Sequence, residues 1–190
     1  RIINALKKSG FHATFFYVGD WITRAGAGGN AEVQYAFESG MEIANHTKTH
    51  PYLSRLGSEA AIKSEADSTH AQLKSIIGAE PSRLLRLPYL DYNSQVQSAL
   101  KDYPLITDRV DTQDWNKASK DQIVSTLKGA MNTNLNGAIV LCHETYDSTA
   151  SAMEEILPYL KSQGWQVVTI SEMFAVKGKQ LVGGQVYTGC

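Results

Sequence analysis

Six polar residues of this chain follow short apolar runs, at points where a strand would give way to a loop. They are His46, His50, Arg86, Asp111, Asp114 and His143. Imidazoles, carboxylates and a guanidinium are the side chains that bind metal ions, transfer protons and hold anionic groups. In sheets and barrels of alternating strands and helices, active sites form at the carboxyl ends of the strands. The repeated placement indicates an enzyme whose reactive side chains share one edge of a sheet.

The first motif is the segment HTKTHP, in which His46 and His50 lie four residues apart after a strand-like run. Two imidazoles on a loop can converge on one divalent metal ion. The hydroxyl of Thr47 can hydrogen-bond either the second ring or the loop backbone. Two histidines do not complete a metal site, so a loop with two surface histidines is the alternative.

The second motif is RLPY, which contains Arg86 and Tyr89. An arginine at a strand end can hold a carboxylate in a bidentate pair and keep it ionised. The backbone N–H of Tyr89 follows Pro88, which stiffens the turn, and can face a developing oxyanion. The alternative is an arginine that pairs with any surface acid.

The third motif is DTQDW, which contains Asp111, Asp114 and Trp115. A carboxylate beside a bulky aromatic side chain suits a site that orients a histidine and encloses a small apolar pocket. The alternative is a loop that caps the helix expected to begin near Ser119, and Asp111 in particular suits such structural work.

The fourth motif ends the apolar run IVLCH at His143. A histidine at the end of a buried strand is well placed for general acid or base catalysis. Leu141 points to the same face two residues earlier and can contact an acyl methyl group. The alternative is a structural histidine that only makes hydrogen bonds.

Helical and extended patterns alternate along the chain, which indicates an α/β fold in one domain over residues 1–190. A glycine-rich stretch at residues 25–30 is expected to break the chain before the second helix. Helices are expected at residues 1–9, up to about 39, 58–77, 95–102, 119–131 and 148–162, and strands at residues 12–18, 41–45, 83–87, 105–110, 138–142 and 165–170.

Composition narrows the functional classes. The 190 residues include 18 basic and 19 acidic side chains, so no strong field favours nucleic acid or an anionic membrane. No apolar run approaches the roughly 20 residues of a membrane span. We therefore expect no nucleic-acid or membrane partner. Cys142 lies within an apolar run and is interpreted as a buried thiol.

In order and spacing, HTKTHP, RLPY, DTQDW and IVLCH resemble the motifs of the polysaccharide deacetylases that share the NodB-type domain, also called carbohydrate esterase family 4. This family includes chitin deacetylases, peptidoglycan N-acetylglucosamine deacetylases and acetylxylan esterases. The flanking segments ATFF, GMEIAN and GWQVVT extend the resemblance over essentially the whole chain. The resemblance implies a distorted (β/α) barrel with its site at the carboxyl ends of the strands.

The resemblance also implies roles for the residues of the first two motifs. His46 and His50 would bind a divalent metal ion, Zn²⁺ or another such as Co²⁺. Arg86 would hold the catalytic base, and the backbone N–H of Tyr89 would bind the oxyanion.

For the other two motifs, the resemblance implies that Asp114 tunes His143, a general acid that protonates the leaving amine or alcohol. Trp115 and Leu141 would line the acetate pocket. The mechanism implied is metal-assisted hydrolysis by a water molecule, without a covalent acyl-enzyme.

One departure from the family pattern stands out. The family's first motif, a TFDDG-like pair of aspartates that supplies the base and the third metal ligand, is absent from this sequence. It should precede a helix equivalent to residues 1–9, so we expect an N-terminally incomplete domain that lacks its first strand. Alone, this chain should neither bind metal tightly nor turn over. The alternative is a catalytically inactive homologue that binds carbohydrate.

Cys190 follows a tail that is expected to be loose. We expect it to pair in a disulfide with a cysteine of the missing N-terminal segment rather than with Cys142. Such a bridge implies a secreted protein, in an extracellular or cell-wall location, as does a polymeric carbohydrate substrate.

The favoured substrate is N-acetylglucosamine in chitin or chitooligosaccharides, and acetylated xylan is the alternative. Substrate subsites are expected in loops at residues 20–30, 90–93 and 145–148. Three aromatic residues expected to be exposed could stack on sugar rings, although plain packing explains each as well. They are Trp21, Tyr92 and Tyr146. We expect a monomer.

Overall fold

The computed structural model describes residues 1–190, which divide into two compact units. We call them the sheet unit, formed by Thr14–Thr107 and Phe174–Tyr187, and the helical unit, formed by Arg1–Ala13, Asp108–Met173 and Thr188–Cys190. Each unit contains its own strands and helices.

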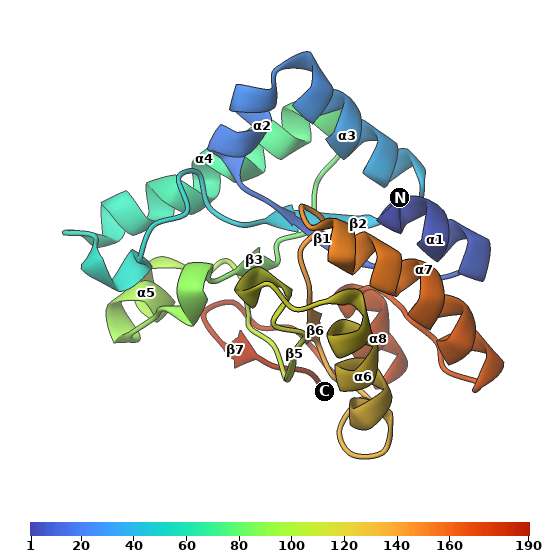
Figure 1. Ribbon diagram of the computed structural model, residues 1–190. Coiled ribbons are helices and arrows are strands. Elements are labelled where there is room, and N and C mark those ends of the chain that lie inside the picture. Colours follow the sequence, from blue (N-terminus) through green and yellow to red (C-terminus); the bar gives the residue numbers. More distant parts are fainter. The chain divides into compact units, whose positions relative to one another are not determined.

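The sheet unit is built on five parallel strands in the order β1-β2-β3-β4-β7 (Figure 1). The strands are β1 (Thr14–Tyr17), β2 (Glu42–Asn45), β3 (Leu85–Arg86), β4 (Leu105–Ile106) and β7 (Val186–Tyr187). The connecting elements are the helices α2 (Gly19–Ala25), α3 (Ala27–Glu38), α4 (Glu59–Ile77) and α5 (Ser94–Ala99), with short 3₁₀ turns at η1 (Leu53–Arg55) and η2 (Pro88–Leu90).

The helical unit contains a second parallel pair of strands, β5 (Val110–Asp111) and β6 (Val140–Leu141). Its helix α7 packs against both α1 and α6. Their bounds are α1 (Ile2–Ser9), α6 (Lys120–Met131) and α7 (Asp147–Ser162), with a 3₁₀ turn at η3 (Asp114–Asn116). A last helix, α8 (Ile170–Val176), begins in this unit and ends in the sheet unit.

Apolar stripes at helical spacing form the core of each unit. In the sheet unit, Ile62 and Ala66 of α4 pack in one cluster with Leu85 of β3 and Leu105 of β4, and all four are fully buried. In the helical unit, α7 buries a stripe that includes Ile156. This burial explains why the strongly periodic helices are the ones that periodicity predicts.

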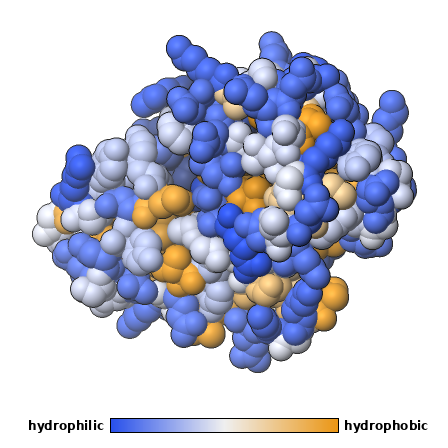
Figure 2. All heavy atoms as spheres, turned by 60° about the horizontal axis from the view of Figure 1, so that its bottom comes forward, coloured by the Kyte–Doolittle hydropathy of each residue, from blue (hydrophilic) through white to orange (hydrophobic).

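The predicted helices at residues 1–9, 58–77, 119–131 and 148–162 are confirmed. Their ends carry local signals: the side chain of Ser58 caps α4, and Ser119 and Gln122 form a reciprocal capping box at the start of α6. None of the helices combines the length and apolar character that a membrane span requires. Figure 2 shows a face covered mostly by hydrophilic side chains and broken by small apolar groups.

The predicted glycine-rich break before the next helix is confirmed at Gly26 alone, and the predicted loop at residues 20–30 is wrong. This stretch is helical on both sides of Gly26, whose φ of 60° separates α2 from α3. Gly29 lies inside α3, where an added Cβ would come within 2.5 Å of the carbonyl oxygen of Ile22. Glycine is needed there because the two helices approach closely, not because the chain turns.

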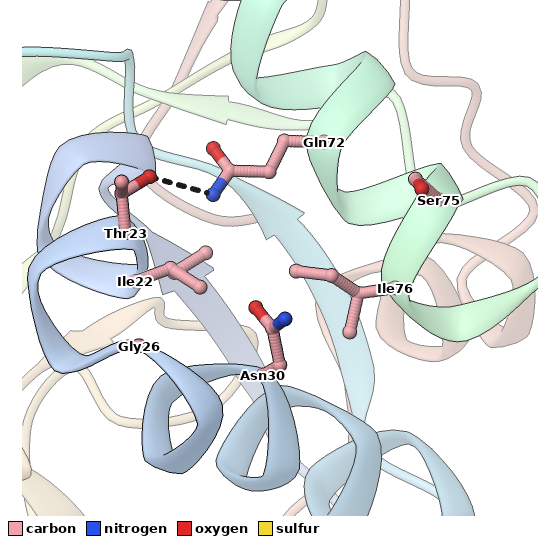
Figure 3. Close-up of a pocket in the computed structure, with 7 residues that line it drawn as sticks. All are labelled: Ile22, Thr23, Gly26, Asn30, Gln72, Ser75 and Ile76. Atoms are coloured by element: carbon pink, nitrogen blue, oxygen red, sulfur yellow. Dashed lines mark hydrogen bonds between the residues drawn. The ribbon is translucent and has the colours of Figure 1, made fainter.

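The helices α2, α3 and α4 also surround a cavity of about 380 Å³ (Figure 3). Gln72 of α4 reaches across it to donate a hydrogen bond to Thr23 of α2 at 3.1 Å. Its other lining residues are Ile22, Gly26, Asn30, Ser75 and Ile76. It contains none of the candidate catalytic or metal-binding residues.

The extended segment predicted at residues 105–110 is two strands of different sheets. The N–H of Thr107 bonds the carbonyl of Tyr187, whereas the N–H of Val110 bonds that of Ile139. A run of strand-forming residues cannot show where a chain changes partner, because propensity is local and pairing is not.

The strand predicted at residues 165–170 is also wrong. Val167 accepts one backbone bond from His12 at 3.2 Å, but no ladder follows. Thr169 and Glu172 instead cap each other's backbone N–H groups, at 2.8 and 3.1 Å, and α8 begins at Ile170. A local capping box therefore overrides the β-branched run.

The expectation of a loose C-terminal tail is wrong as well. Val186 and Tyr187 pair with β4, and the N–H of Cys190 bonds the carbonyl of Gly137 at 2.8 Å. Cys190 and Cys142 are not joined by a disulfide. The apolar run at residues 138–142 forms only the short strand β6, and Cys142 is partly exposed.

Candidate functional site

Neighbouring strands of the sheet unit place His46 and Arg86 side by side. Asn45 of β2 pairs with Leu85 of β3, so the residues that follow each of them are adjacent. The ring Nδ1 of His46 lies 2.9 Å from the backbone carbonyl oxygen of Arg86. Because a carbonyl oxygen only accepts hydrogen bonds, Nδ1 carries the proton. This leaves Nε2 as the nitrogen with a lone pair for a metal ion.

The rings of His46 and His50 present the same atom to each other. Their Nε2 atoms lie 3.2 Å apart, and the rings meet edge to face with centroids 4.6 Å apart. Two nitrogens bound tetrahedrally to one zinc-like ion, each about 2.0–2.1 Å from it, would be roughly 3.3 Å apart. The separation therefore fits two ligands of a single ion. The chain holds no group of three or more His, Cys, Asp or Glu side chains placed to bind a metal, and His46 and His50 are a facing pair.

The loop that carries the two histidines has an unusual backbone. Thr47 and His50 have φ angles of 66° and 61°, in the left-handed region that favours glycine. The hydroxyl of Thr47 accepts the N–H of His50 at 3.1 Å. Of the two partners considered for this hydroxyl, the loop backbone is the one observed.

Aromatic rings surround His50. Trp21 stacks on its ring at 5.5 Å, and Tyr89 meets it edge-on at 4.7 Å. Tyr52 stacks on Tyr89 at 4.1 Å, and the guanidinium of Arg55 lies 4.0 Å above the Tyr52 ring. Trp21 and Tyr89 are about half exposed, at 51% and 56%. The sequence analysis singled out Trp21 but did not name Tyr52 or Arg55. The only local signal for this cluster was that Tyr52 is an aromatic residue soon after His50.

Arg86 and Tyr89 flank the turn that follows β3. Arg86 is 8% exposed, and its carbonyl is the group that orients His46. Tyr89 follows Pro88 with a φ of 56°, again in the left-handed region. The proline and this conformation give the turn a defined shape, which is the requirement for a backbone N–H that binds an oxyanion.

In the helical unit, the neighbouring strands β5 and β6 place Asp114 beside His143. Asp111 pairs with Leu141, and Asp114 and His143 follow these strand ends. Oδ1 of Asp114 lies 2.7 Å from the ring Nδ1 of His143, and Oδ2 accepts the backbone N–H of His143. The carboxylate also accepts the Thr149 hydroxyl at 2.8 Å and the Trp115 N–H at 2.8 Å. Thr149, in the first turn of α7, was missed because nothing in its local sequence marks it.

Asp114 is fully buried, whereas the side chain of His143 is 39% exposed. Burial acts to raise the pKa of Asp114, but the hydrogen bonds from the ring and backbone of His143 and from Thr149 outweigh it. The pKa of Asp114 therefore lies below its usual value. The aspartate stays ionised at neutral pH and holds the Nδ1–H of His143, so Nε2 is the ring atom that can exchange a proton.

Asp111 and Trp115 belong to the turn before α6. Asp111 accepts the N–H of Gln113 at 2.8 Å and the indole N–H of Trp115 at 3.1 Å. It does not cap α6, because Ser119 does. Trp115 is 54% exposed, and Leu141 is partly buried in β6.

The sequence model of the family described as "Polysaccharide deacetylase" matches residues 1–107. The chain is 34% identical over 184 residues to the peptidoglycan-N-acetylmuramic acid deacetylase PdaC of Bacillus subtilis, covering 93% of this chain and 36% of the relative. It is 30% identical over 183 residues to the peptidoglycan-N-acetylglucosamine deacetylase PgdA of Listeria monocytogenes, covering 94% of this chain and 37% of the relative. The chain thus spans little more than a third of the length of these curated relatives.

Solved structures share the fold. PdaC of Bacillus subtilis has a TM-score of 0.81 at 32% identity, covering 93% of this chain and 83% of that one. A "T48 deacetylase with substrate" has a TM-score of 0.86 at 24% identity, covering 98% and 87%. A family 4 acetyl xylan esterase from Clostridium thermocellum, solved with a cobalt ion, has a TM-score of 0.85 at 24% identity, covering 99% and 90%. The α/β fold class predicted from the sequence is confirmed.

Proposed function

Because the chain belongs to the polysaccharide deacetylase family, we propose that it serves the hydrolytic removal of acetyl groups from an acetylated polysaccharide. One observation carries the proposal beyond the family: the Nε2 atoms of His46 and His50 lie 3.2 Å apart, with His46 oriented by the carbonyl of Arg86. Two unrelated surface histidines would not be expected to bring the same ring atom, Nε2, so close together.

We propose an amide-linked acetyl group on an N-acetylated amino-sugar polymer as the substrate. The sequence favoured N-acetylglucosamine in chitin or chitooligosaccharides. The similarity to PdaC and PgdA supports peptidoglycan as a second polymer of the same chemical class. An ester on acetylated xylan is the alternative, since amide and ester cleavage differ mainly in the leaving group.

A divalent metal ion fits the histidine pair. His46 and His50 would hold it through Nε2, and we propose that an aspartate outside these residues supplies the third protein ligand, with a second aspartate as the base. When bound, Zn²⁺ or Co²⁺ would polarise the acetyl carbonyl and lower the pKa of a bound water. Arg86 would keep the base ionised, and the backbone N–H of Tyr89 would stabilise the oxyanion.

His143 is proposed to protonate the leaving nitrogen through Nε2. Asp114 supports this step because its ionised carboxylate holds the Nδ1–H of His143 and so fixes the ring with Nε2 free for the proton transfer. Trp115 and Leu141 are proposed to line the pocket for the acetyl methyl group. The exposed Trp21 ring, next to His50, is proposed to stack on a sugar.

The experiment is acetate release by the full-length protein from chitooligosaccharides, peptidoglycan and acetylated xylan, with added Zn²⁺ or Co²⁺ and after chelation. We expect metal-dependent release from an amino-sugar polymer and its loss in His46→Ala. Lys48→Ala, on the same loop but not a ligand, is the matched control. Release that is equal in His46→Ala and the wild type would refute the proposal.

A second candidate is a catalytically inactive homologue that binds carbohydrate. The observation that favours it is the similarity to a solved structure described as a "CE4 family pseudoenzyme", with a TM-score of 0.79 at 28% identity. Full-length protein that binds the glycan in a pull-down with insoluble polymer, but releases no acetate with either metal, would support this candidate.

We also propose a secreted protein, in an extracellular or cell-wall location, because a polymeric glycan is found there. The bridge from Cys190 to a cysteine outside these residues stays a prediction, as does a monomeric state. Mass mapping of the full-length protein with and without reduction tests the bridge.

A further inference from the structure

The loop between His46 and His50 is held by side chains. Four consecutive backbone N–H groups, from Thr47 to His50, each donate to a side-chain oxygen. The acceptors are Asn45 Oδ1 for Thr47 at 2.8 Å, Glu65 Oε2 for Lys48 and Thr49 at 3.0 and 2.8 Å, and Thr47 Oγ1 for His50 at 3.1 Å. The loop therefore owes its conformation to specific polar groups that the proposed reaction does not use.

This conformation needs such support. Thr47 and His50 both adopt positive φ angles, of 66° and 61°, although neither is glycine. A side chain beyond Cα makes this region unfavourable, so it persists only where the surroundings impose it. Without the side-chain acceptors, we expect the loop backbone to leave this conformation, so that the Nε2 atoms of His46 and His50 no longer face one point.

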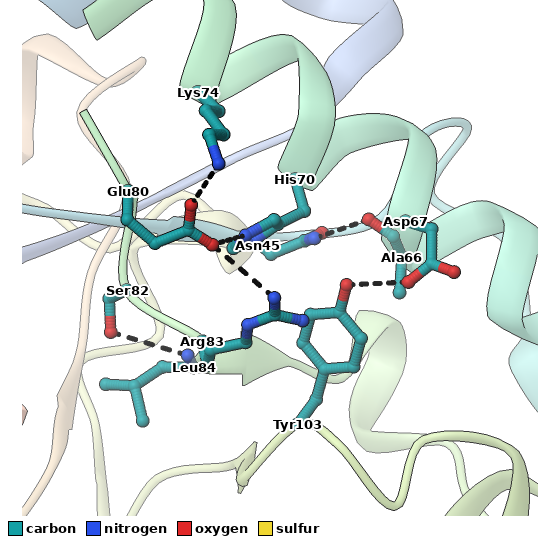
Figure 4. A network of polar contacts seen from close by, with 10 residues as sticks. All are labelled: Asn45, Ala66, Asp67, His70, Lys74, Glu80, Ser82, Arg83, Leu84 and Tyr103. Carbon is teal, nitrogen blue, oxygen red and sulfur yellow. Dashed lines mark hydrogen bonds and ion pairs between the residues drawn. The ribbon is translucent and has the colours of Figure 1, made fainter. Parts of the chain in front are cut away.

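Helix α4 provides the support from outside the loop. The carboxylate of Glu65 accepts three hydrogen bonds, because the hydroxyl of Thr49 donates to Oε1 at 2.9 Å in addition to the two backbone bonds. At the next residue of α4, the carbonyl of Ala66 accepts the side-chain N–H of Asn45 at 2.7 Å (Figure 4). Two successive residues of one helix thus hold the loop, one of them through the buried Asn45.

We propose that Glu65 is a positioning residue for the metal-binding histidine pair; this inference rests on the proposed function. Glu65 acts on the ion only through the loop, by holding the amides of Lys48 and Thr49 so that both Nε2 atoms face one point. A carboxylate suits this task because it has two oxygens, both of which accept. Glutamine has nearly the same shape but one acceptor oxygen, so its NH₂ group would face either the two backbone N–H groups or the Thr49 hydroxyl, which would then have to turn and accept.

The test compares Glu65→Gln with the wild type in the full-length protein. Glu59→Gln is the matched control, because Glu59 is an exposed acid of the same helix that makes no contact with the loop. The measurements are Zn²⁺ affinity, by competition with a chromophoric chelator, and amide hydrogen exchange in the peptide that contains the loop. We expect about 10-fold weaker Zn²⁺ binding and faster loop exchange in Glu65→Gln, and neither change in Glu59→Gln.

The outcomes separate the two proposals. Wild-type protein that binds no Zn²⁺ overturns the proposed function together with this inference. Wild-type protein that binds Zn²⁺, with equal affinity in Glu65→Gln, overturns the positioning role alone. Should Glu65→Gln not fold, Thr49→Val removes only the hydroxyl contact. It should weaken Zn²⁺ binding in the same direction by a smaller factor, and unchanged binding there would overturn the role.

Discussion

The buried carboxylate of Asp114 accepts hydrogen bonds from both the ring and the backbone of His143. It also accepts the hydroxyl of Thr149 and the backbone N–H of Trp115, so each of its two oxygens accepts two hydrogen bonds. This relationship ties the stability of the helical unit to the orientation of one histidine.

Replacing Asp114 with asparagine should lower both stability and activity. The amide NH₂ would face donors that now meet a carboxylate oxygen, which should reduce the free energy of unfolding by about 2–3 kcal/mol. Acetate release should fall roughly 10²–10⁴-fold, because His143 would lose the partner that fixes its proton on Nδ1. Urea unfolding and acetate assays of the full-length protein measure the two effects.

The control for this change is Asp121→Asn, which removes an exposed acid of the same unit. Its stability should stay within about 0.5 kcal/mol of the wild type. If Asp114→Asn were as stable and as active as Asp121→Asn, the hydrogen bonds between Asp114 and His143 would contribute to neither stability nor activity, which contradicts the prediction.

Acid should destabilise the wild type more steeply than Asp114→Asn. The pKa of Asp114 is lowered in the folded chain, so its contribution to stability is complete above the unfolded pKa of about 3.9. That contribution is lost as the pH falls through the lower, folded pKa. Unfolding free energies measured from pH 6 down to pH 2 should therefore stay apart above about pH 4 and draw together below it. Glu154 and Glu172 also have lowered pKa values, but they act in both proteins and cancel in the difference. Parallel curves would contradict the assignment.

Two adjacent glycines of α3 should respond to alanine with opposite signs. In Gly29→Ala the new Cβ would come within 2.5 Å of the Ile22 carbonyl oxygen, which should destabilise the sheet unit by about 1–3 kcal/mol. In Gly28→Ala the Cβ meets nothing within 4 Å, and the lower entropy of the unfolded chain should stabilise by about 0.4–1 kcal/mol. Urea midpoints decide, and equal shifts would show that α2 and α3 do not pack as described.

Zn²⁺ should stabilise the full-length protein against heat through the histidine pair. A ligand that binds only the folded state at 100 times its Kd adds about 2.7 kcal/mol. His50→Ala removes one of the two facing Nε2 atoms and should abolish most of the rise in Tm. The control is His12→Ala, since His12 pairs with Glu172 in the other unit. A rise in Tm that survives in His50→Ala would place the metal elsewhere.

The sequence predicted best where the signal was local. The helix that begins after Ser119 is preceded by a capping box formed within four consecutive residues, and α4 has apolar residues at helical spacing along its length. The strand predicted at residues 165–170 failed although its residues favour strands, because Thr169 and Glu172 cap a helix instead. Most strands of this chain are only two residues long, so partners along the sheet, rather than propensity, define them.

The candidate residues show the same division. Residue types and their places at strand ends were enough to single out His46, His50, Asp114 and His143. Glu65 and Thr149 were not predicted, because nothing in the local sequence distinguishes them from other helix residues. Only their long-range hydrogen bonds identify them. That His143 and the histidine pair act on one substrate stays a prediction, which the acetate assays test.

The sequence alone thus determined which reactive side chains follow the apolar runs, imidazoles and carboxylates, and that strands and helices alternate. It did not determine how each histidine ring is oriented. His46 is oriented by a carbonyl 40 residues away, and His143 by a carboxylate 29 residues away. Hydrogen bonds select a tautomer and a rotamer only once folding brings such distant groups within about 3 Å, and local sequence carries no record of that distance.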